Sequence, residues 1–142
     1  MSKAVFREHF EQIWNNKDVS GIERFIARDY RGFDAAELIS GIAGYKQHFE
    51  TITTAFADLR ITIEVLMAEE NREAARWFVE ATHTGSLGNI PPSGKRVRMT
   101  GTAIVRTTND QIVEEHANSD ALGLLTQIGI TPASVNVPPL FF

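Results

Sequence analysis

The sequence predicts a single α+β domain, and three observations lead to this prediction. The chain of 142 residues has the length of one domain. Apolar residues recur every three or four positions before Asp58 and every second position after it, so helices precede strands. No alternation of strand and helix follows, which favours helices segregated from an antiparallel sheet over a doubly wound parallel sheet.

Three helices are expected in the first part of the chain. The apolar stripe of residues 6–14 predicts the first helix. The sequence SGIE at residues 20–23 matches a capping box, whose serine begins a second helix and whose glutamate reaches back to it. Apolar positions spaced by three and four over residues 42–56 predict a longer third helix. Residues 28–40 have little periodicity and are expected to be irregular, with room for a short strand.

Four strands are expected to follow as an antiparallel meander, over residues 59–68, 73–84, 97–107 and 112–119. The second of them is rich in aromatic and β-branched residues, which favour a pleated, half-buried surface. Three glycines and a Pro-Pro pair make residues 85–96 a loop. A short helix is expected over residues 121–128, because Gly129 stands where the left-handed residue that ends a helix belongs.

The composition excludes several classes of protein. The sequence contains no cysteine, so disulfides, thiolate metal sites and a cysteine nucleophile are excluded. With 14 Lys and Arg against 18 Asp and Glu, the chain has no basic excess for nucleic acid. Its N-terminus lacks the apolar core of a signal peptide, and no apolar run reaches membrane-spanning length. We therefore expect a cytoplasmic protein that binds neither nucleic acid nor membrane.

Several short motifs resemble those of one family, the SnoaL-like polyketide or ester cyclases of the nuclear transport factor 2-like superfold. In chain order they are Gly41 and Gly44, AFADLR at residues 55–60, Arg76 followed by ATHTG at residues 81–85, IPPSGKR at residues 90–96, IVEE at residues 112–115, and DALGLLTQIG at residues 120–129. Their order and spacing extend the resemblance over residues 1–130, which are expected to form one SnoaL-like domain. Residues 131–142 then form an apolar, proline-rich tail, expected to cover the pocket mouth or a dimer partner.

The resemblance implies a cone: a curved antiparallel sheet wrapped around the N-terminal helices, with an internal pocket for a small hydrophobic ligand. It also implies a homodimer that packs through the outer face of the sheet. In this family the reaction is an intramolecular aldol closure of a polyketide ester without a cofactor. The acid/base group implied by the resemblance is Asp120.

Two residues are the candidate catalytic groups, and each also has a structural interpretation. An Asp120 carboxylate in an apolar pocket would have a raised pKa suited to taking a proton from carbon. Alternatively, Asp120 caps the helix that follows it, and backbone donors then lower its pKa. His83 either donates a hydrogen bond that stabilises an enolate or ties the end of its strand to the following loop.

Three more polar residues share a strand face with Asp120, namely Glu114, His116 and Asn118. This face is either a wet functional concavity or a solvated surface. His116 is either a second acid/base group or a surface histidine, since family members typically carry tryptophan at this position and at Ser119.

The remaining candidate ligand contacts are Arg76, Trp77 and Phe33. Arg76 either holds a substrate ester or forms an ion pair within the sheet. Trp77 and Phe78 point to opposite faces, so one of them lines the cavity. Phe33 stands where family members often have histidine, which implies a more apolar ligand or a loss of the family's catalysis. The four histidines show no metal-ligand spacing, so no metal is expected.

We therefore expect a cyclase-type acid/base enzyme acting on a small hydrophobic carbonyl or ester compound. One alternative is a binding module of the same fold without catalysis. A lower-ranked alternative is an epoxide hydrolase-like enzyme, in which Asp120 and Arg76 would belong to an Asp–Arg–Asp relay around a water molecule.

Overall fold

The computed structural model describes residues 2–34, 36–131 and 136–142. Its elements in chain order are α1 (Ser2–His9), the π-helical turn η1 (Phe10–Asn15), α2 (Ser20–Phe25), β1 (Ile26–Asp34), β2 (Ala36–Ser40), α3 (Gly41–Ala55), β3 (Arg60–Glu69), β4 (Arg72–Thr82), β5 (Arg96–Thr108), β6 (Gln111–Ser119) and α4 (Ala121–Gln127). The predicted α+β class is confirmed.

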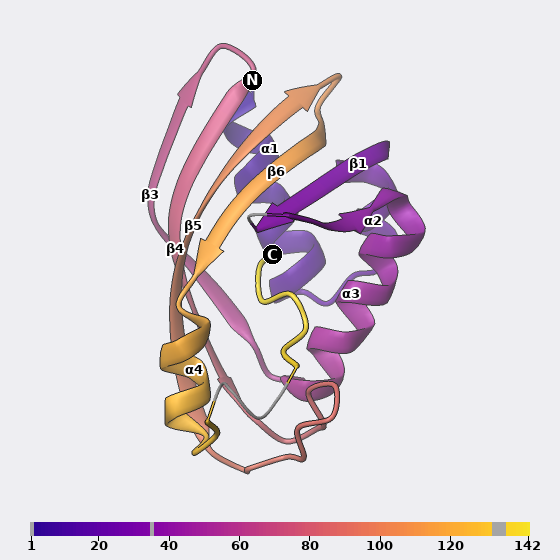
Figure 1. Cartoon of the computed structure of the whole chain (residues 1–142). Coiled ribbons are helices and arrows are strands. Elements are labelled where there is room, and N and C mark those ends of the chain that lie inside the picture. Colours follow the sequence, from indigo (N-terminus) through magenta and orange to yellow (C-terminus); the bar gives the residue numbers. More distant parts are fainter. Residues whose placement is uncertain (1, 35, 132–135) are drawn as a thin grey trace.

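The six strands form one curved sheet in the order β2-β1-β6-β5-β4-β3 (Figure 1). The predicted meander of four strands is confirmed as β3 to β6. Where residues 28–40 were expected to be irregular with room for one short strand, the structure has two strands, β1 and β2, and β1 pairs with β6 in parallel. A register shift between Gly32 and Phe33 interrupts the alternation there, so the period of two is hidden in the sequence.

Helices α1, α2 and α3 lie against the concave side of the sheet, and α4 follows β6 at its lower end (Figure 1). The predicted capping box is wrong. Ser20 donates from both its hydroxyl and its backbone N–H to Asp18, at 2.6 and 3.0 Å. Glu23 instead accepts a hydrogen bond from Lys46. At the other end of the chain, Gly129 has a φ of 80°, as its expected place after a helix requires.

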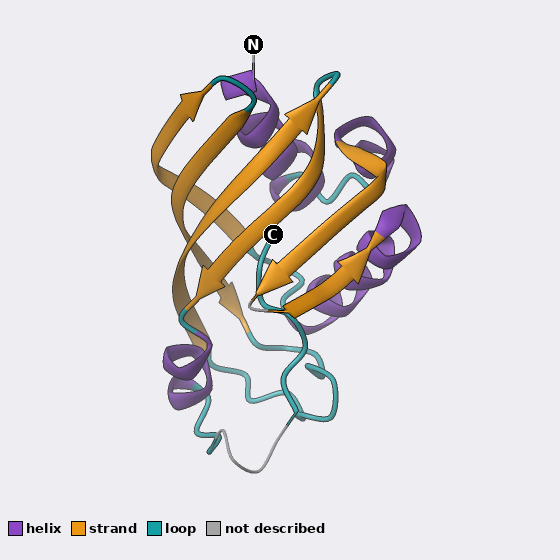
Figure 2. Cartoon of the chain, turned by 45° about the horizontal axis from the view of Figure 1, so that its top comes forward, coloured by secondary structure: helices purple, strands orange, loops and turns teal. Residues whose placement is uncertain are grey.

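The C-terminal segment runs from an exposed residue, Asn136, to three buried ones. Residues 136–142 run between the sheet and α3 into the interior (Figure 2). Leu140, Phe141 and Phe142 are all buried. The expectation of a tail over the pocket mouth or a dimer partner stays a prediction, and its residues 132–135 lie outside the described residues. In the described part of the chain, no helix is long and apolar enough to cross a membrane.

Candidate functional site

Alternate residues of the central strands face the interior of the cone. On β4 the side chains of Ala75, Trp77 and Val79 are buried, and Trp77 is fully enclosed. Phe78 lies on the opposite face under the guanidinium of Arg98, 4.0 Å from its ring centre. Trp77 is therefore the aromatic residue of this pair that lines the interior.

A carboxyl group stands at the centre of this inner face. Glu115 of β6 is completely buried, and the hydroxyl of Tyr30 on β1 donates to its Oε1 at 2.8 Å. Its second oxygen, Oε2, has no hydrogen-bond partner among the described residues. Burial raises the pKa of Glu115 to about 8, although the hydrogen bond from Tyr30 opposes this shift. Glu115 is thus mostly protonated at neutral pH and close to losing its proton.

A β-bulge explains why Glu115 faces inward. Arg106 pairs with Glu114 and Thr107 pairs with Ile112, so Val113 is an extra residue in β6. After this bulge the alternation places Glu115 and Ala117 inside. Sequence reasoning did not identify Glu115, because neither face of this strand is apolar enough to indicate which one is buried.

A second hydrogen-bonded pair lies beside the first. The indole N–H of Trp14 donates to the hydroxyl of Tyr45 at 3.0 Å. The rings of Tyr30 and Tyr45 meet edge to face, with centroids 5.2 Å apart. Burial holds the pKa of both tyrosines well above the usual range, and the nearby Glu115 carboxylate raises these pKa values further. Both phenols therefore stay protonated and can donate hydrogen bonds.

His48 of α3 completes the polar lining of this region. Burial lowers its pKa to about 4, so the imidazole is neutral at physiological pH. Its Nε2 is hydrogen-bonded to the backbone carbonyl of Phe141, which requires the proton on Nε2. The interior thus offers one acid near neutrality and several neutral donors.

The enclosed volume in the interior is small, although His48 also lines an open hollow of about 190 Å³ beside Pro138 and Pro139. An apolar cavity of about 20 Å³ lies between α3, α4 and the tail, with Phe56, Leu124, Leu140 and Phe142 among its lining residues. A void of this size holds roughly one water molecule.

The structure places Asp120 away from this interior. It is exposed and caps α4, with Oδ1 accepting from the backbone N–H of Gly123 at 2.9 Å. The expectation of a pocket carboxylate at this position does not match the structure. The physical reason is that its strand face is the outer one, opposite to Glu115.

His83 is buried at the end of β4, where it joins the strand to the loop of residues 85–95. Its Nδ1 accepts from the backbone N–H of Ser93 at 3.1 Å and lies 2.9 Å from the Ser93 hydroxyl. Its ring also packs against Phe56. Burial lowers the pKa of His83 below its usual value. These contacts match the structural interpretation given above.

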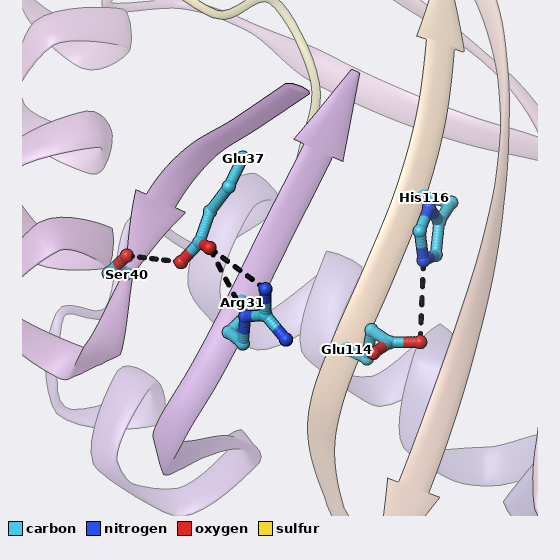
Figure 3. Close-up of polar contacts among 5 residues, drawn as sticks. All are labelled: Arg31, Glu37, Ser40, Glu114 and His116. Atoms are coloured by element: carbon cyan, nitrogen blue, oxygen red, sulfur yellow. Dashed lines mark hydrogen bonds and ion pairs between the residues drawn. The ribbon is translucent and has the colours of Figure 1, made fainter. Parts of the chain in front are cut away.

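The other predicted ligand contacts lie on the outer face of the sheet. Phe33 stacks on His116, with ring centroids 4.6 Å apart, and Asn118 is exposed. His116 also contacts Glu114 at 3.3 Å, beside a separate group in which Arg31 and Ser40 both donate to Glu37 (Figure 3). Phe33, His116 and Asn118 were expected to contact the ligand, and their position does not match this. The strand face that carries His116, Asn118 and Asp120 is the one exposed to solvent.

Arg76 also lies on the outer face, where it pairs with Glu64 at 3.3 Å and remains half exposed. This matches the interpretation as an ion pair within the sheet. Of the two residues considered for an epoxide hydrolase relay, Arg76 therefore pairs with Glu64 and Asp120 caps α4. In the described residues, no group of three or more His, Asp or Glu side chains is arranged to hold a metal ion.

Solved structures with the same architecture include AclR, "a putative hydroxylase from Streptomyces galilaeus", at 31% identity and a TM-score of 0.82. That match covers 92% of this chain and 86% of AclR. TsrD from Streptomyces laurentii is 25% identical with a TM-score of 0.82, covering 92% of this chain and 96% of TsrD. IdmH from Streptomyces antibioticus, "a putative polyketide cyclase", shares the fold at 21% identity and a TM-score of 0.78, covering 92% of this chain and 99% of IdmH.

The search of curated proteins gave no match. The family model of SnoaL-like polyketide cyclase matches residues 4–128, which is most of the chain. Together with the six-stranded cone, this match establishes that the chain belongs to the family of SnoaL-like polyketide cyclases.

Proposed function

We propose that this protein is an acid/base catalyst that acts on a small hydrophobic carbonyl or ester compound inside the cone. The reaction is an aldol-type ring closure or a related proton transfer. The observation that carries the proposal is Glu115, a fully buried carboxyl at the centre of the inner face with Oε2 free of any described partner. Because a buried, unpaired polar atom is costly, such a group points to a functional use.

The chemistry follows from the position and pKa of this group. In its ionised form Glu115 takes a proton from the carbon next to a carbonyl, and the electron pair moves onto the carbonyl oxygen to form an enolate. A pKa near the working pH allows both uptake and return of the proton. Tyr30 holds Oε1, so Oε2 is the oxygen left for the substrate. The neutral imidazole of His48 can donate from Nε2 to the enolate oxygen.

Ring closure needs one further step. The enolate carbon attacks a second carbonyl of the same molecule, and a carbon–carbon bond forms. The proton held by Glu115 then passes to the new alkoxide, so the carboxylate is regenerated. This route uses only groups of the chain itself and requires no cofactor.

Asp120 and His83 have a smaller part in this proposal than the motif resemblance implies. The contact of Asp120 with the N-terminus of α4 supports a capping role. The contact of His83 with Ser93 supports a structural role at the end of β4.

The test is proton exchange at an enolisable carbon. The protein is incubated with 2-tetralone in deuterated buffer, and loss of the α-proton signal is followed by NMR. We expect exchange faster than in buffer alone, and loss of this acceleration in Glu115→Gln. Asp120→Asn is the matched control and is expected to retain it. Equal exchange with Glu115→Gln and with the unmodified protein would refute the role of Glu115.

A second candidate function is hydroxylation, which the 31% identity to AclR favours. It would need an oxidant from outside the chain. Mass spectrometry of the product separates the two candidates, because ring closure by aldol addition adds no oxygen while hydroxylation adds one atom. If neither reaction occurs and Glu115→Gln binds ligand as the unmodified protein does, the chain is a binding module.

A homodimer through the outer sheet face is part of the same proposal. The pairing registers align Met67, Ala74, Ile104, His116 and Phe33 across five strands, and Met67 and Ile104 are 62% and 53% exposed. Such an exposed apolar row is typical of an interface.

We expect a dimer by sedimentation and a monomer for Ile104→Glu. Leu122→Glu, on the exposed surface of α4, is the control and should stay dimeric. An Ile104→Glu protein that stays dimeric would exclude this face.

A further inference from the structure

The tail occupies the middle of the candidate site. In Figures 1 and 2 its path lies between the inner face of the sheet and α3. Phe141 and Phe142 are 1% and 3% exposed, although they belong to a segment with no helix or strand. A segment without regular structure is rarely the centre of a core, because its backbone lacks regular hydrogen-bond partners.

The two tryptophans of the chain both contact this segment. The ring of Phe142 meets Trp14 and Trp77 edge to face, with centroids 5.0 and 5.2 Å away and interplanar angles of 84° in each case. The sequence contains no other tryptophan. An aromatic ring thus contacts two indoles that come from different elements, η1 and β4.

The next residue supplies a carbonyl group to the same region. The backbone oxygen of Phe141 accepts the hydrogen bond of His48, and the Phe141 ring lies 5.6 Å from the imidazole. The backbone of Phe142 also contacts the buried imidazole of His9. The segment is held mainly by the burial of its apolar side chains, which another apolar molecule could replace.

The tail fills the interior almost completely but leaves two buried polar atoms there without a hydrogen bond. The remaining cavity of about 20 Å³ is far below the roughly 300–1,000 Å³ of a ligand pocket. Two polar atoms in the same region, Oε2 of Glu115 and Nε1 of Trp77, are nevertheless buried without a partner. Phenylalanine rings fill the space and satisfy neither atom. A ligand with oxygens in addition to one that replaces the Phe141 carbonyl could bond these two atoms.

We infer that residues 138–142 occupy the ligand volume of the cone, and that the ligand which displaces them is an aromatic compound with a carbonyl oxygen. Its ring takes the place of Phe142 between Trp14 and Trp77, and its oxygen takes the place of the Phe141 carbonyl at His48. This inference rests on the proposed function for the location of the site. It adds the chemical class of the ligand and an intramolecular competitor.

A competitor within the chain lowers the apparent affinity in proportion to the fraction of molecules whose cone is open. If the tail is inserted in nine molecules of ten, removing it strengthens binding about tenfold. The tail also explains how a buried acid near neutrality is kept from water until a ligand enters.

The test compares the full chain with a variant that lacks residues 138–142. The probe is 2-acetylnaphthalene, and its dissociation constant is measured by calorimetry. Tryptophan fluorescence, which reports on Trp14 and Trp77 alone, gives a second reading. Circular dichroism and a cooperative thermal transition establish that the shortened chain is folded. We expect the folded variant to bind the probe at least about tenfold more tightly.

Two further experiments test whether the ligand and the tail exclude each other from the same volume. A synthetic peptide with the sequence of residues 136–142 should compete with the probe for the shortened chain. In the full chain, Phe142→Ala should also strengthen binding, and Leu122→Ala on the exposed face of α4 should not. If the shortened chain does not fold, the result with Phe142→Ala decides. Unchanged or weaker binding, or simultaneous binding of peptide and probe, would overturn the inference.

The ligand class has its own comparison. The hydrocarbon 2-ethylnaphthalene matches the probe in size and lacks its oxygen. We expect the shortened chain to prefer the ketone and His48→Phe in that chain to lose the preference. If the shortened chain with His48 intact binds both compounds equally, the claim that the ligand carries a carbonyl oxygen is refuted. These readings measure binding alone, so absence of proton exchange with intact binding would count against the proposed function and leave this inference standing.

Discussion

Replacing Glu115 by glutamine should make the protein more stable at alkaline pH. The pKa of a glutamate is about 4.5 when exposed, and burial raises that of Glu115 to about 8. Between these values the folded chain keeps a proton that the unfolded chain has lost. The free energy of unfolding therefore falls as the pH rises from about 4.5 to about 8, and it is constant above that. Glutamine has no such proton to lose.

The size of the effect follows from the same two values. A difference of about 3.5 pKa units, at about 1.4 kcal/mol each, gives about 5 kcal/mol as the largest gain in stability above pH 8. The glutamine side chain has nearly the same shape and can still accept the hydrogen bond from Tyr30. Near pH 5 the glutamate is protonated in the folded state, so the two proteins should differ little there.

The assay is urea unfolding followed by tryptophan fluorescence, at about pH 5 and about pH 8.5. Glu73, whose pKa burial raises to about 7, and the buried His9 and His48 also contribute to the pH dependence. These three groups are present in both proteins. The difference in unfolding free energy between the unmodified chain and Glu115→Gln therefore reports on Glu115 alone. Glu114→Gln, next to it on the outer face, is the control. A Glu115→Gln protein whose stability parallels that of the unmodified chain at both pH values would refute the reasoning.

Three further predictions concern the same region and its surroundings. Tyr30→Phe removes the hydrogen bond that opposes the raised pKa, so the pH dependence assigned to Glu115 should move to higher pH, as urea unfolding across pH would show. Asp120→Ala removes a helix cap and should cost about 1 kcal/mol in a thermal or urea transition, with proton exchange unchanged. Gly101→Ala places a methyl group against the indole of Trp77, so it should cost about 1–3 kcal/mol and alter the fluorescence spectrum.

The fold was predictable where the periodicity is regular. The alternation along residues 59–68 and 73–84 identified β3 and β4, and the stripe over residues 42–56 identified α3. The first two strands were not predictable in the same way, because the bulge next to Gly32 breaks their alternation. Their pairing with β6 also depends on residues far away in the sequence.

The site was harder to predict for a related reason. The period of two correctly placed His116, Asn118 and Asp120 on one face, but it does not say which face is buried. Polarity was a poor guide here, since the inner face carries Glu115 and the outer face carries exposed apolar side chains such as Met67 and Ile104. Burial of Glu115 depends on the bulge at Val113 and on Tyr30, 85 residues away. Such a contact leaves no local pattern in the sequence.

The parallel pairing of β1 with β6 has a consequence for the order of folding. β1 ends at Asp34, while its neighbour in the sheet is complete only at Ser119. During synthesis, one edge of β1 therefore stays unpaired until nearly the whole chain has emerged. Contacts between residues so far apart in the sequence form slowly. The hydrogen bond between Tyr30 and Glu115 joins the same two strands, β1 and β6. The hydrogen bond by which Tyr30 orients Glu115 therefore cannot form before β6 has paired with β1.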